Sequence, residues 1–323
     1  MEFKEKFEAL FKNELSQEEA RKFLIELYKK KETPKEIAIA AEIMRKYSIK
    51  LPLSKELQEK LIDIVGTGGD KSNSFNISST TALLISSIGS IVAKHGNRSI
   101  TSKSGSADML EALGININLP PNKQVKMLEE VGFTFIFAIN HHPAMKHIMP
   151  IRKSIPHRTI FNLLGPLTNP ANAKKYLLGV YTPEFLELFA GALSLMNVKR
   201  AMVISSEDGM DEISIAAPTK AIYYDGKRFR DMRINPLIYG MFGSKEDLVG
   251  GDAKENAKIT RGILSGEIKG PKRDVVLLNA AAALMVDNKV SSIEEGIEIA
   301  KEAIDSKKAI NHLEKIIEVS KKL

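Results

Sequence analysis

A glycine-rich turn is the first feature of the sequence that could carry chemistry. Gly66-Thr67-Gly68-Gly69-Asp70 lies between a short apolar segment and a small-residue segment that predicts a helix. Three glycines within four positions allow positive φ angles and a close approach of the backbone to a ligand. The N–H groups of such a turn and the start of the next helix bind anions. An ordinary strand-to-helix turn would need one glycine, so the segment predicts a phosphate site. Its spacing matches neither the Walker A loop nor the dinucleotide fingerprint.

Hydroxyl and amide side chains follow this turn in unusual number. One such residue would be enough to cap the next helix. The excess predicts a polar site for phosphate oxygens or a metal ion. The residues are Ser72, Ser74, Asn76, Ser78, Ser79, Thr80 and Thr81.

A second polar segment, residues 94–106, follows the next predicted strand. It contains three cations, Lys94, Arg98 and Lys103, with several hydroxyls and two glycines. This composition predicts a second phosphate site, with an ordinary surface loop as the alternative. Two anion sites on neighbouring turns would suit a substrate that has phosphates at both ends. His95 also lies in this segment, where positioning or hydrogen bonding suits it better than acid–base catalysis.

An acidic segment follows a later predicted strand. It contains Glu207, Asp208, Asp211 and Glu212. Carboxylates in such a loop suit Mg²⁺, which keeps several waters and shares phosphate oxygens with its substrate. From these residues alone, a solvated acidic turn is the simpler interpretation, and magnesium binding is the alternative.

The middle of the chain holds histidines and arginines. Residues 141–147 include three histidines, but their spacing matches no zinc motif. Arg152 and Arg158 follow, and an arginine beside a pocket suits a small carboxylate, which it can grip with two hydrogen bonds. This part of the sequence therefore favours recognition of a carboxylate over metal binding.

The elements that must position these residues fall into two parts. Residues 1–60 show helical spacing of apolar side chains and capping boxes at Ser16 and Thr33, so they predict a small helical domain. We expect helices within 142–170 to complete it. Residues 61–323 alternate strands with helices, which predicts a large α/β domain with a central, mostly parallel sheet flanked by helices. The predicted strands cover 61–65, 91–94, 133–138, 177–180 and 201–205, with a strand pair at 213–217 and 219–224.

Composition excludes several classes of protein. The 323 residues include no Cys, which excludes disulfides, thiolate nucleophiles and Cys-based metal sites and fits a cytoplasmic location. The charged N-terminus does not resemble a secretion signal. The longest nearly apolar run, 275–286, is interrupted by Asn279 and is too short to span a membrane. A net charge of +7 permits a polyanionic ligand or nucleic acid, but lysines scattered over helix surfaces are the simpler explanation.

Together, these motifs closely resemble the anthranilate phosphoribosyltransferase family. The matching segments run in order from about Asp63 to Glu212: IVGTGGD, FNIS, AKHGNRS, SGSADMLEALG, HHPAMK, RTIFNLLGPLTNP and DEIS. The resemblance implies transfer of the phosphoribosyl group of phosphoribosyl pyrophosphate to anthranilate, a step of tryptophan synthesis. It also implies Mg²⁺ as the cofactor, with two ions, and a homodimer formed through the helical domains.

The resemblance assigns roles to individual residues. Contacts to phosphoribosyl pyrophosphate are implied for Gly66, Gly69, Asp70, Ser74, Asn76, Ile77, Ser78, Ser79, Lys94, His95, Gly96, Asn97 and Ser106. Contacts to anthranilate are implied for Gly66, Asn97, His142, Arg152 and Pro166. Metal ligation is implied for Ser78, Asp211 and Glu212, and catalytic roles for Asp70, Lys94 and Arg152.

Three departures from the family pattern and two alternatives accompany this interpretation. Ser74 and Ser79 replace threonines but keep a hydroxyl, and Ile155-Pro156 replaces Leu-Gly and stiffens the segment that carries Arg152. The N-terminal helical region is shorter than usual in the family. A pyrimidine nucleoside phosphorylase-like enzyme is one alternative, against which the Asp211–Glu212 pair and the RTIFNLLGP segment argue. The other is an inactive relative that binds nucleic acid, against which the complete substrate motifs argue.

Overall fold

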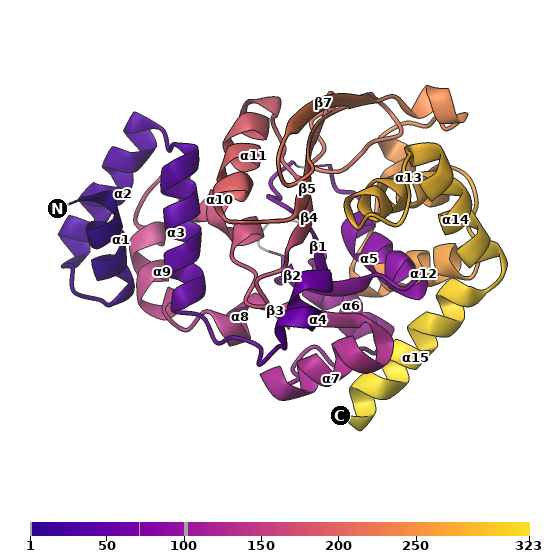
Figure 1. Cartoon of the computed structure of the whole chain (residues 1–323), viewed down its shortest axis with the longest axis horizontal. Helices are drawn as coiled ribbons and strands as arrows, with labels where there is room; N and C mark the ends of the chain where they lie inside the picture. Colours follow the sequence, from indigo (N-terminus) through magenta and orange to yellow (C-terminus); the bar gives the residue numbers. More distant parts are fainter. Residues whose placement is uncertain (1, 71, 100–102) are drawn as a thin grey trace.

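A computed structural model of the chain describes residues 2–70, 72–99 and 103–323, and the order of its elements fits the predicted α/β class (Figure 1). The α-helices are α1 (Phe3–Phe11), α2 (Gln17–Lys30), α3 (Pro34–Lys46), α4 (Lys55–Lys60), α5 (Ile77–Ser87), α6 (Ser106–Leu113), α7 (Pro121–Val131), α8 (Ala138–His141), α9 (Met145–Lys153), α10 (Phe161–Leu164), α11 (Leu186–Leu195), α12 (Ala253–Leu264), α13 (Pro271–Val286), α14 (Ile293–Asp305) and α15 (Lys308–Lys322). Short 3-10 helices are η1 (Gly165–Leu167), η2 (Pro183–Phe185), η3 (Pro236–Tyr239) and η4 (Glu246–Leu248). None of the helices in the described ranges is long and apolar enough to cross a membrane.

The strands form one mixed sheet with the order β3-β2-β1-β4-β5-β6-β7. They are β1 (Leu61–Gly66), β2 (Ile91–Gly96), β3 (Phe133–Phe137), β4 (Lys175–Gly179), β5 (Arg200–Ser206), β6 (Thr219–Tyr224) and β7 (Phe229–Ile234). The first five in chain order pair in parallel, and β6 and β7 are antiparallel. This confirms the predicted central, mostly parallel sheet, and it places the turns after β1, β2, β4 and β5 at one edge.

Two apolar cores cover the two faces of this sheet, because side chains alternate along each strand. In β5, Met202 and Ile204 point into a core shared with α5, α6, α7 and α12–α15. Ala201 and Val203 point into a second core, which we call the N-terminal core. It joins α1–α3 with α9–α11, and Phe7 stacks there on Phe161 with ring centroids 5.8 Å apart. In Figure 1, α1–α3 and α9 lie together at one end of the molecule, and α10 and α11 lie between them and the sheet.

The N-terminal helices begin where the sequence predicts. Ser16 and Thr33 accept hydrogen bonds from the backbone of Glu19 and Glu36, and each glutamate side chain bonds back to the cap residue. These are the two predicted capping boxes. The sequence predicts a domain boundary at residue 60. The N-terminal core contains side chains from both sides of this position, and the boundary stays a prediction.

One predicted strand pair is wrong. Residues 213–217 form no strand, and β6 pairs instead with β5 on one side and β7 on the other. The strand β7 was missed because half of its side chains are charged and most are exposed, as in Arg230 and Asp231, which is typical of an edge strand. The Asp225-Gly226 turn between β6 and β7 was an available hairpin signal.

Candidate active site

A cavity of about 850 Å³ lies at the carboxyl ends of β1, β2, β4 and β5. It brings together the glycine-rich turn after β1, the segment after β2 and the acidic loop after β5. Of the residues that the sequence singles out, it is lined by Gly66, Gly69, Asp70, Ser74, Asn76, Ser78, Ser79, Lys94, His95, Gly96, Asn97, Ser106, Asp211 and Glu212. Ile77, His142, Arg152 and Pro166 are not among its lining residues.

The glycine-rich turn packs directly against Asp211. The backbone N–H of Gly68 donates to Asp211 Oδ2 at 2.7 Å, and Gly68 and Gly69 have φ angles of +66° and +82°. Gly66 pairs in register with Gly179 of β4. A Cβ atom on Gly66 would lie 2.3 Å from Asp211 Oδ2, and one on Gly179 would lie 1.5 Å from the Asp211 carbonyl oxygen. Glycine at both positions is therefore what allows the acidic loop to approach the sheet edge.

Three carboxylates meet at this point. Asp70, Asp211 and Glu212 each offer an oxygen within 4.8 Å of the others. Burial, followed by the neighbouring carboxylates, raises the pKa of Asp211 to about 7 and the pKa of Glu212 well above its usual value. Asp70 Oδ2 is buried and has no hydrogen-bond partner among the described residues. Hard oxygen donors crowded in this way fit Mg²⁺, because a cation would relieve the repulsion and satisfy the orphaned oxygen.

Lys94 is a buried cation beside these carboxylates. Its Nζ donates to the Ile64 carbonyl at 2.6 Å and to Ser78 Oγ at 3.3 Å. Burial lowers the pKa of Lys94, while the charges of Asp63, Glu212 and Asp211 oppose this shift. The lysine therefore belongs to the same electrostatic cluster as the candidate metal ligands.

Asp63 is a buried carboxylate of β1 that interacts with Lys94. Burial raises its pKa to about 6, against the opposing effect of Lys94. Its carboxylate accepts the backbone N–H of His95 at 3.2 Å and the Asn169 amide at 2.8 Å. Asn169 also donates to the Ala93 carbonyl at 2.8 Å, so this pair of residues ties the end of β2 to β1.

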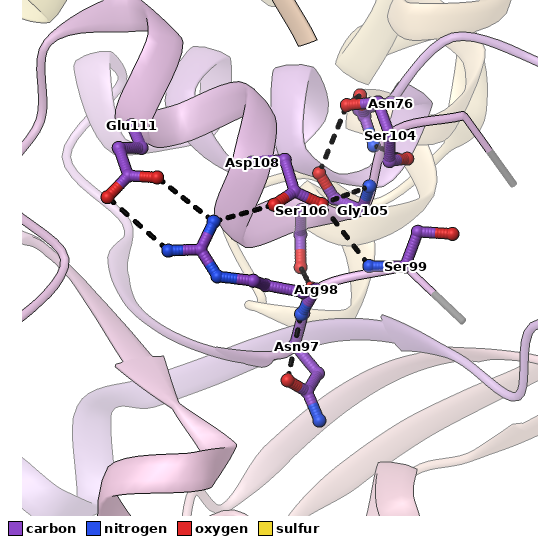
Figure 2. A network of polar contacts seen from close by, with 9 residues as sticks. All are labelled: Asn76, Asn97, Arg98, Ser99, Ser104, Gly105, Ser106, Asp108 and Glu111. Atoms are coloured by element: carbon purple, nitrogen blue, oxygen red, sulfur yellow. Dashed lines mark hydrogen bonds and ion pairs between the residues drawn. The ribbon is translucent and has the colours of Figure 1, made fainter. Parts of the chain in front are cut away.

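Arg98 holds its own loop, which Figure 2 shows from close by. Its guanidinium forms ion pairs with Asp108 at 2.6 Å and Glu111 at 2.9 Å, both on α6. The other oxygen of Asp108 accepts the backbone N–H groups of Ser99 at 3.2 Å and Gly105 at 2.9 Å. Of the three cations predicted to bind phosphate, Arg98 is thus already paired with carboxylates. The loop between these bonds includes residues 100–102, which lie outside the described part of the chain.

Further hydrogen bonds join the polar segments of the cavity wall. Ser106 Oγ donates to the Asn97 carbonyl at 3.2 Å (Figure 2). The Asn76 amide nitrogen donates to the Ser104 carbonyl at 3.2 Å, and its oxygen accepts from the Asn256 amide at 2.9 Å. These bonds connect the two predicted phosphate segments to each other and to α12.

His95 and His142 form a buried pair in which burial favours the neutral form of each ring. Burial lowers the pKa of His95 well below its usual value and that of His142 to about 4. His95 Nδ1 lies 3.2 Å from the Gly165 carbonyl, which only accepts, so Nδ1 carries the proton. His95 Nε2 must then accept from His142 Nε2, 3.3 Å away. Both rings are fixed by this arrangement, which suits positioning.

Two arginines differ in what they are bonded to. Arg158 lines the cavity, and its two terminal nitrogens lie 3.2 and 3.1 Å from the carboxylate oxygens of buried Glu32. Arg152 lies on α9 with its guanidinium 5.3 Å from the Phe161 ring centroid, and burial lowers its pKa. Within the described ranges no carboxylate pairs with Arg152. Arg152 therefore keeps its capacity for a carboxylate ligand.

Sequence reasoning missed several cavity residues. Gly179, Tyr181 and Asn279 line the cavity but were not assigned to it. Gly179 falls inside a predicted strand, and its role is visible only once β1 and β4 are paired. Asn279 did give a signal, as the polar interruption of an apolar run.

A family model matches most of the chain, and individual relatives match nearly all of it. Residues 58–310 match the model of the glycosyl transferase family, a/b domain. An anthranilate phosphoribosyltransferase of Petrotoga mobilis is 44% identical over 98% of this chain and 91% of the relative. One of Acetivibrio thermocellus is 50% identical over 92% of this chain and 85% of the relative.

Solved structures agree. The crystal structure of anthranilate phosphoribosyltransferase from Thermus thermophilus has a TM-score of 0.92 and 39% identity, over 99% of this chain and 96% of that one. The Saccharomyces cerevisiae enzyme in complex with PRPP and Mg has a TM-score of 0.85 and 30% identity, over 95% and 86%. The same yeast enzyme in complex with 4-fluoroanthranilate has a TM-score of 0.86 and 28% identity, over 98% and 91%.

Proposed function

The chain belongs to the anthranilate phosphoribosyltransferase family, and on that premise we propose how its cavity performs the family's reaction. The enzyme transfers the phosphoribosyl group of phosphoribosyl pyrophosphate to the amino nitrogen of anthranilate. Pyrophosphate leaves, and N-(5-phosphoribosyl)anthranilate, an intermediate of tryptophan biosynthesis, is formed. The observation that carries the assignment to this cavity is the meeting of the glycine-rich turn with the carboxylates Asp70, Asp211 and Glu212.

The donor is proposed to occupy the cavity between the turns after β1 and β2. The backbone of Gly66–Asp70 and the start of α5 (Asn76–Ser79) offer N–H and hydroxyl groups to the pyrophosphate. Lys94, Asn97 and Ser106 would hold the phosphates and ribose. Ser74, His95 and Gly96 line the same cavity, which supports their place around the donor.

Magnesium is proposed to bind at Ser78, Asp211 and Glu212, as two ions. The donor set supports this, since neighbouring carboxylates with raised pKa values gain from a cation between them. The chemistry that magnesium supplies when bound is neutralisation of the negative charge of the departing pyrophosphate. Asp70 contributes its buried, unpartnered oxygen to the same cluster.

Anthranilate is proposed to be held by Arg152 and Asn97, with Gly66, His142 and Pro166 along its path. The support is that Arg152 pairs with no carboxylate in the described part of the chain, whereas Arg158 already pairs with Glu32. The aromatic amine is a neutral nucleophile that loses its proton late, so no strong base is needed. The neutral His95–His142 pair fits this. Catalysis is then mainly positioning, which can lower the barrier by roughly 7–11 kcal/mol.

Consumption of anthranilate tests the function directly. Purified protein with phosphoribosyl pyrophosphate and Mg²⁺ should remove anthranilate fluorescence, EDTA should stop the reaction, and excess Mg²⁺ should restore it. No consumption by folded protein with both substrates saturating would contradict the assignment and favour a phosphorolysis assay. The comparisons do not favour the phosphorylase-like or nucleic-acid-binding alternatives.

Arg152→Ala should affect the binding of anthranilate much more than the binding of the phosphoribosyl donor. We expect the KM for anthranilate to rise about 10- to 100-fold, since a charge-assisted contact of about 1.5–3 kcal/mol is lost. The KM for the donor should change much less. Steady-state kinetics with each substrate varied in turn measure both. A selective loss of donor binding would overturn the role of Arg152.

The homodimer stays a prediction from the family resemblance, and the cytoplasmic location stays a prediction from the absence of Cys. Sedimentation velocity at several concentrations tests the first.

A further inference from the structure

Helix α13 is apolar nearly throughout and yet carries one buried amide. Residues Val275–Val286 are buried, and Asn279 is 2% exposed among them. Burying an amide in apolar surroundings is unfavourable unless its hydrogen bonds are replaced. The partners of Asn279 therefore indicate why a polar side chain stands at this position.

Asn279 forms hydrogen bonds with both backbone polar groups of a single residue, Ile213, and we call this pair of bonds the grip of Asn279. Its Oδ1 accepts the N–H of Ile213 at 3.0 Å, and its Nδ2 donates to the Ile213 carbonyl at 2.8 Å. The same Nδ2 also donates to the Val275 carbonyl at 2.8 Å, which fixes the orientation of the amide. Within the predicted strand at 213–217, which does not form, the backbone groups of Ile213 are thus bonded to a side chain and not to a neighbouring strand.

Ile213 directly follows Asp211 and Glu212. The other side of this short segment rests on Gly66 and Gly179, where added methyl groups would meet Asp211 at 2.3 and 1.5 Å. The segment is thus held between the glycine pair on the sheet and Asn279 on α13. Both polar atoms of Asn279 are engaged in this grip, although its side chain lines the cavity.

We propose that Asn279 is a positioning residue of the metal site, which holds Asp211 and Glu212 at the separation that the ion requires. The proposal rests on the proposed function, because it presupposes that these carboxylates bind Mg²⁺. Carboxylates on a loop are useful ligands only if the loop is fixed, and groups that orient metal ligands typically affect metal affinity about 10- to 100-fold.

Metal binding without turnover tests the proposal. The probe is Mn²⁺, titrated into full-length protein with inorganic pyrophosphate and followed by the electron paramagnetic resonance of free Mn²⁺. Asn279→Ala should raise the Kd for Mn²⁺ about 10- to 100-fold. Asn279→Ser, which keeps one hydrogen-bonding group, should give a smaller rise, and it preserves the test if the alanine variant does not fold.

Gln124→Ala is the matched control. Gln124 is also a fully buried amide on a helix, and it donates to the Phe135 carbonyl at 3.3 Å, away from the acidic loop. The Gln124→Ala substitution should lower the melting temperature while leaving the Kd for Mn²⁺ within about twofold of the wild-type value. Folded Asn279 variants that lose stability but bind Mn²⁺ like the wild type would overturn the positioning role. Failure of the wild type itself to bind Mn²⁺ would overturn the metal site of the proposed function, and this inference with it.

Discussion

Glu212→Gln should lower kcat about 100-fold or more at saturating Mg²⁺. The substitution keeps the shape of a half-buried side chain and removes one of the three converging carboxylates. A contribution of about 3 kcal/mol to transition-state charge stabilisation corresponds to roughly a 100-fold effect on rate. The Mg²⁺ concentration for half-maximal rate should rise as well. Anthranilate consumption at varied Mg²⁺ measures both quantities.

The same variant should be more stable than the wild type when metal is absent. The pKa values of Asp211 and Glu212 are raised in the fold, so the folded state binds protons more tightly than the unfolded state does. Stability from these groups is present below their ordinary pKa values of 3.8 and 4.5, and it is lost as pH rises through the folded pKa, about 7 for Asp211. Melting temperatures in EDTA should therefore fall with pH more steeply for the wild type than for Glu212→Gln. Equal slopes, together with unchanged kcat, would remove Glu212 from the site.

Lys94→Met should weaken both the fold and donor binding. Lys94 is 2% exposed and its charge opposes those of Asp63, Asp211 and Glu212. Removing one partner from a buried group of charges typically costs about 3–5 kcal/mol. The donor also loses a cation beside its phosphates, so its Kd should rise about 100-fold. Isothermal titration with phosphoribosyl pyrophosphate and thermal melting follow the two effects.

The pH dependence of the melting temperature of Lys94→Met identifies why the variant loses stability. Without the lysine, the carboxylates lose a charge that lowers their pKa values. Protonating them should relieve the damage, so the difference in melting temperature from the wild type should be smaller at pH 5 than at pH 8. Lys269→Met removes the same charge from an exposed position and should leave stability and donor binding nearly unchanged. A loss independent of pH would point to lost packing instead.

The sequence predicted those features that depend on neighbours in the chain. Capping boxes, buried parallel strands and the glycine-rich turn are local patterns, and the structure confirms the elements they imply. The metal cluster was harder to predict, because Asp70 and Asp211 meet only after β1 and β5 are placed in one sheet. From the residues alone, a solvated acidic turn was the simpler interpretation.

Two other features depend on contacts between separate segments and show the limit of pattern reasoning. The sequence places Arg98 in a cationic loop, which predicts a phosphate ligand. Its actual partners, Asp108 and Glu111, lie on the helix that follows the loop. Residues 213–217 have the composition of a strand, but the grip of Asn279 on Ile213 lies 66 positions away in sequence. The sequence shows Asn279 as a polar interruption of an apolar run, but it does not show which residue the amide contacts.

The N-terminal core affects how the protein folds while it is being synthesised on the ribosome. The helices α1–α3 end at Lys46, whereas apolar side chains that cover them, such as Ile148 and Phe161, follow roughly 100 residues later. At about 5–20 residues per second, these helices wait roughly 5–20 s for their partners. Their phenylalanine-rich faces are exposed to chaperones and to other nascent chains throughout that interval. The helices that begin the chain are therefore among the elements that complete their packing late.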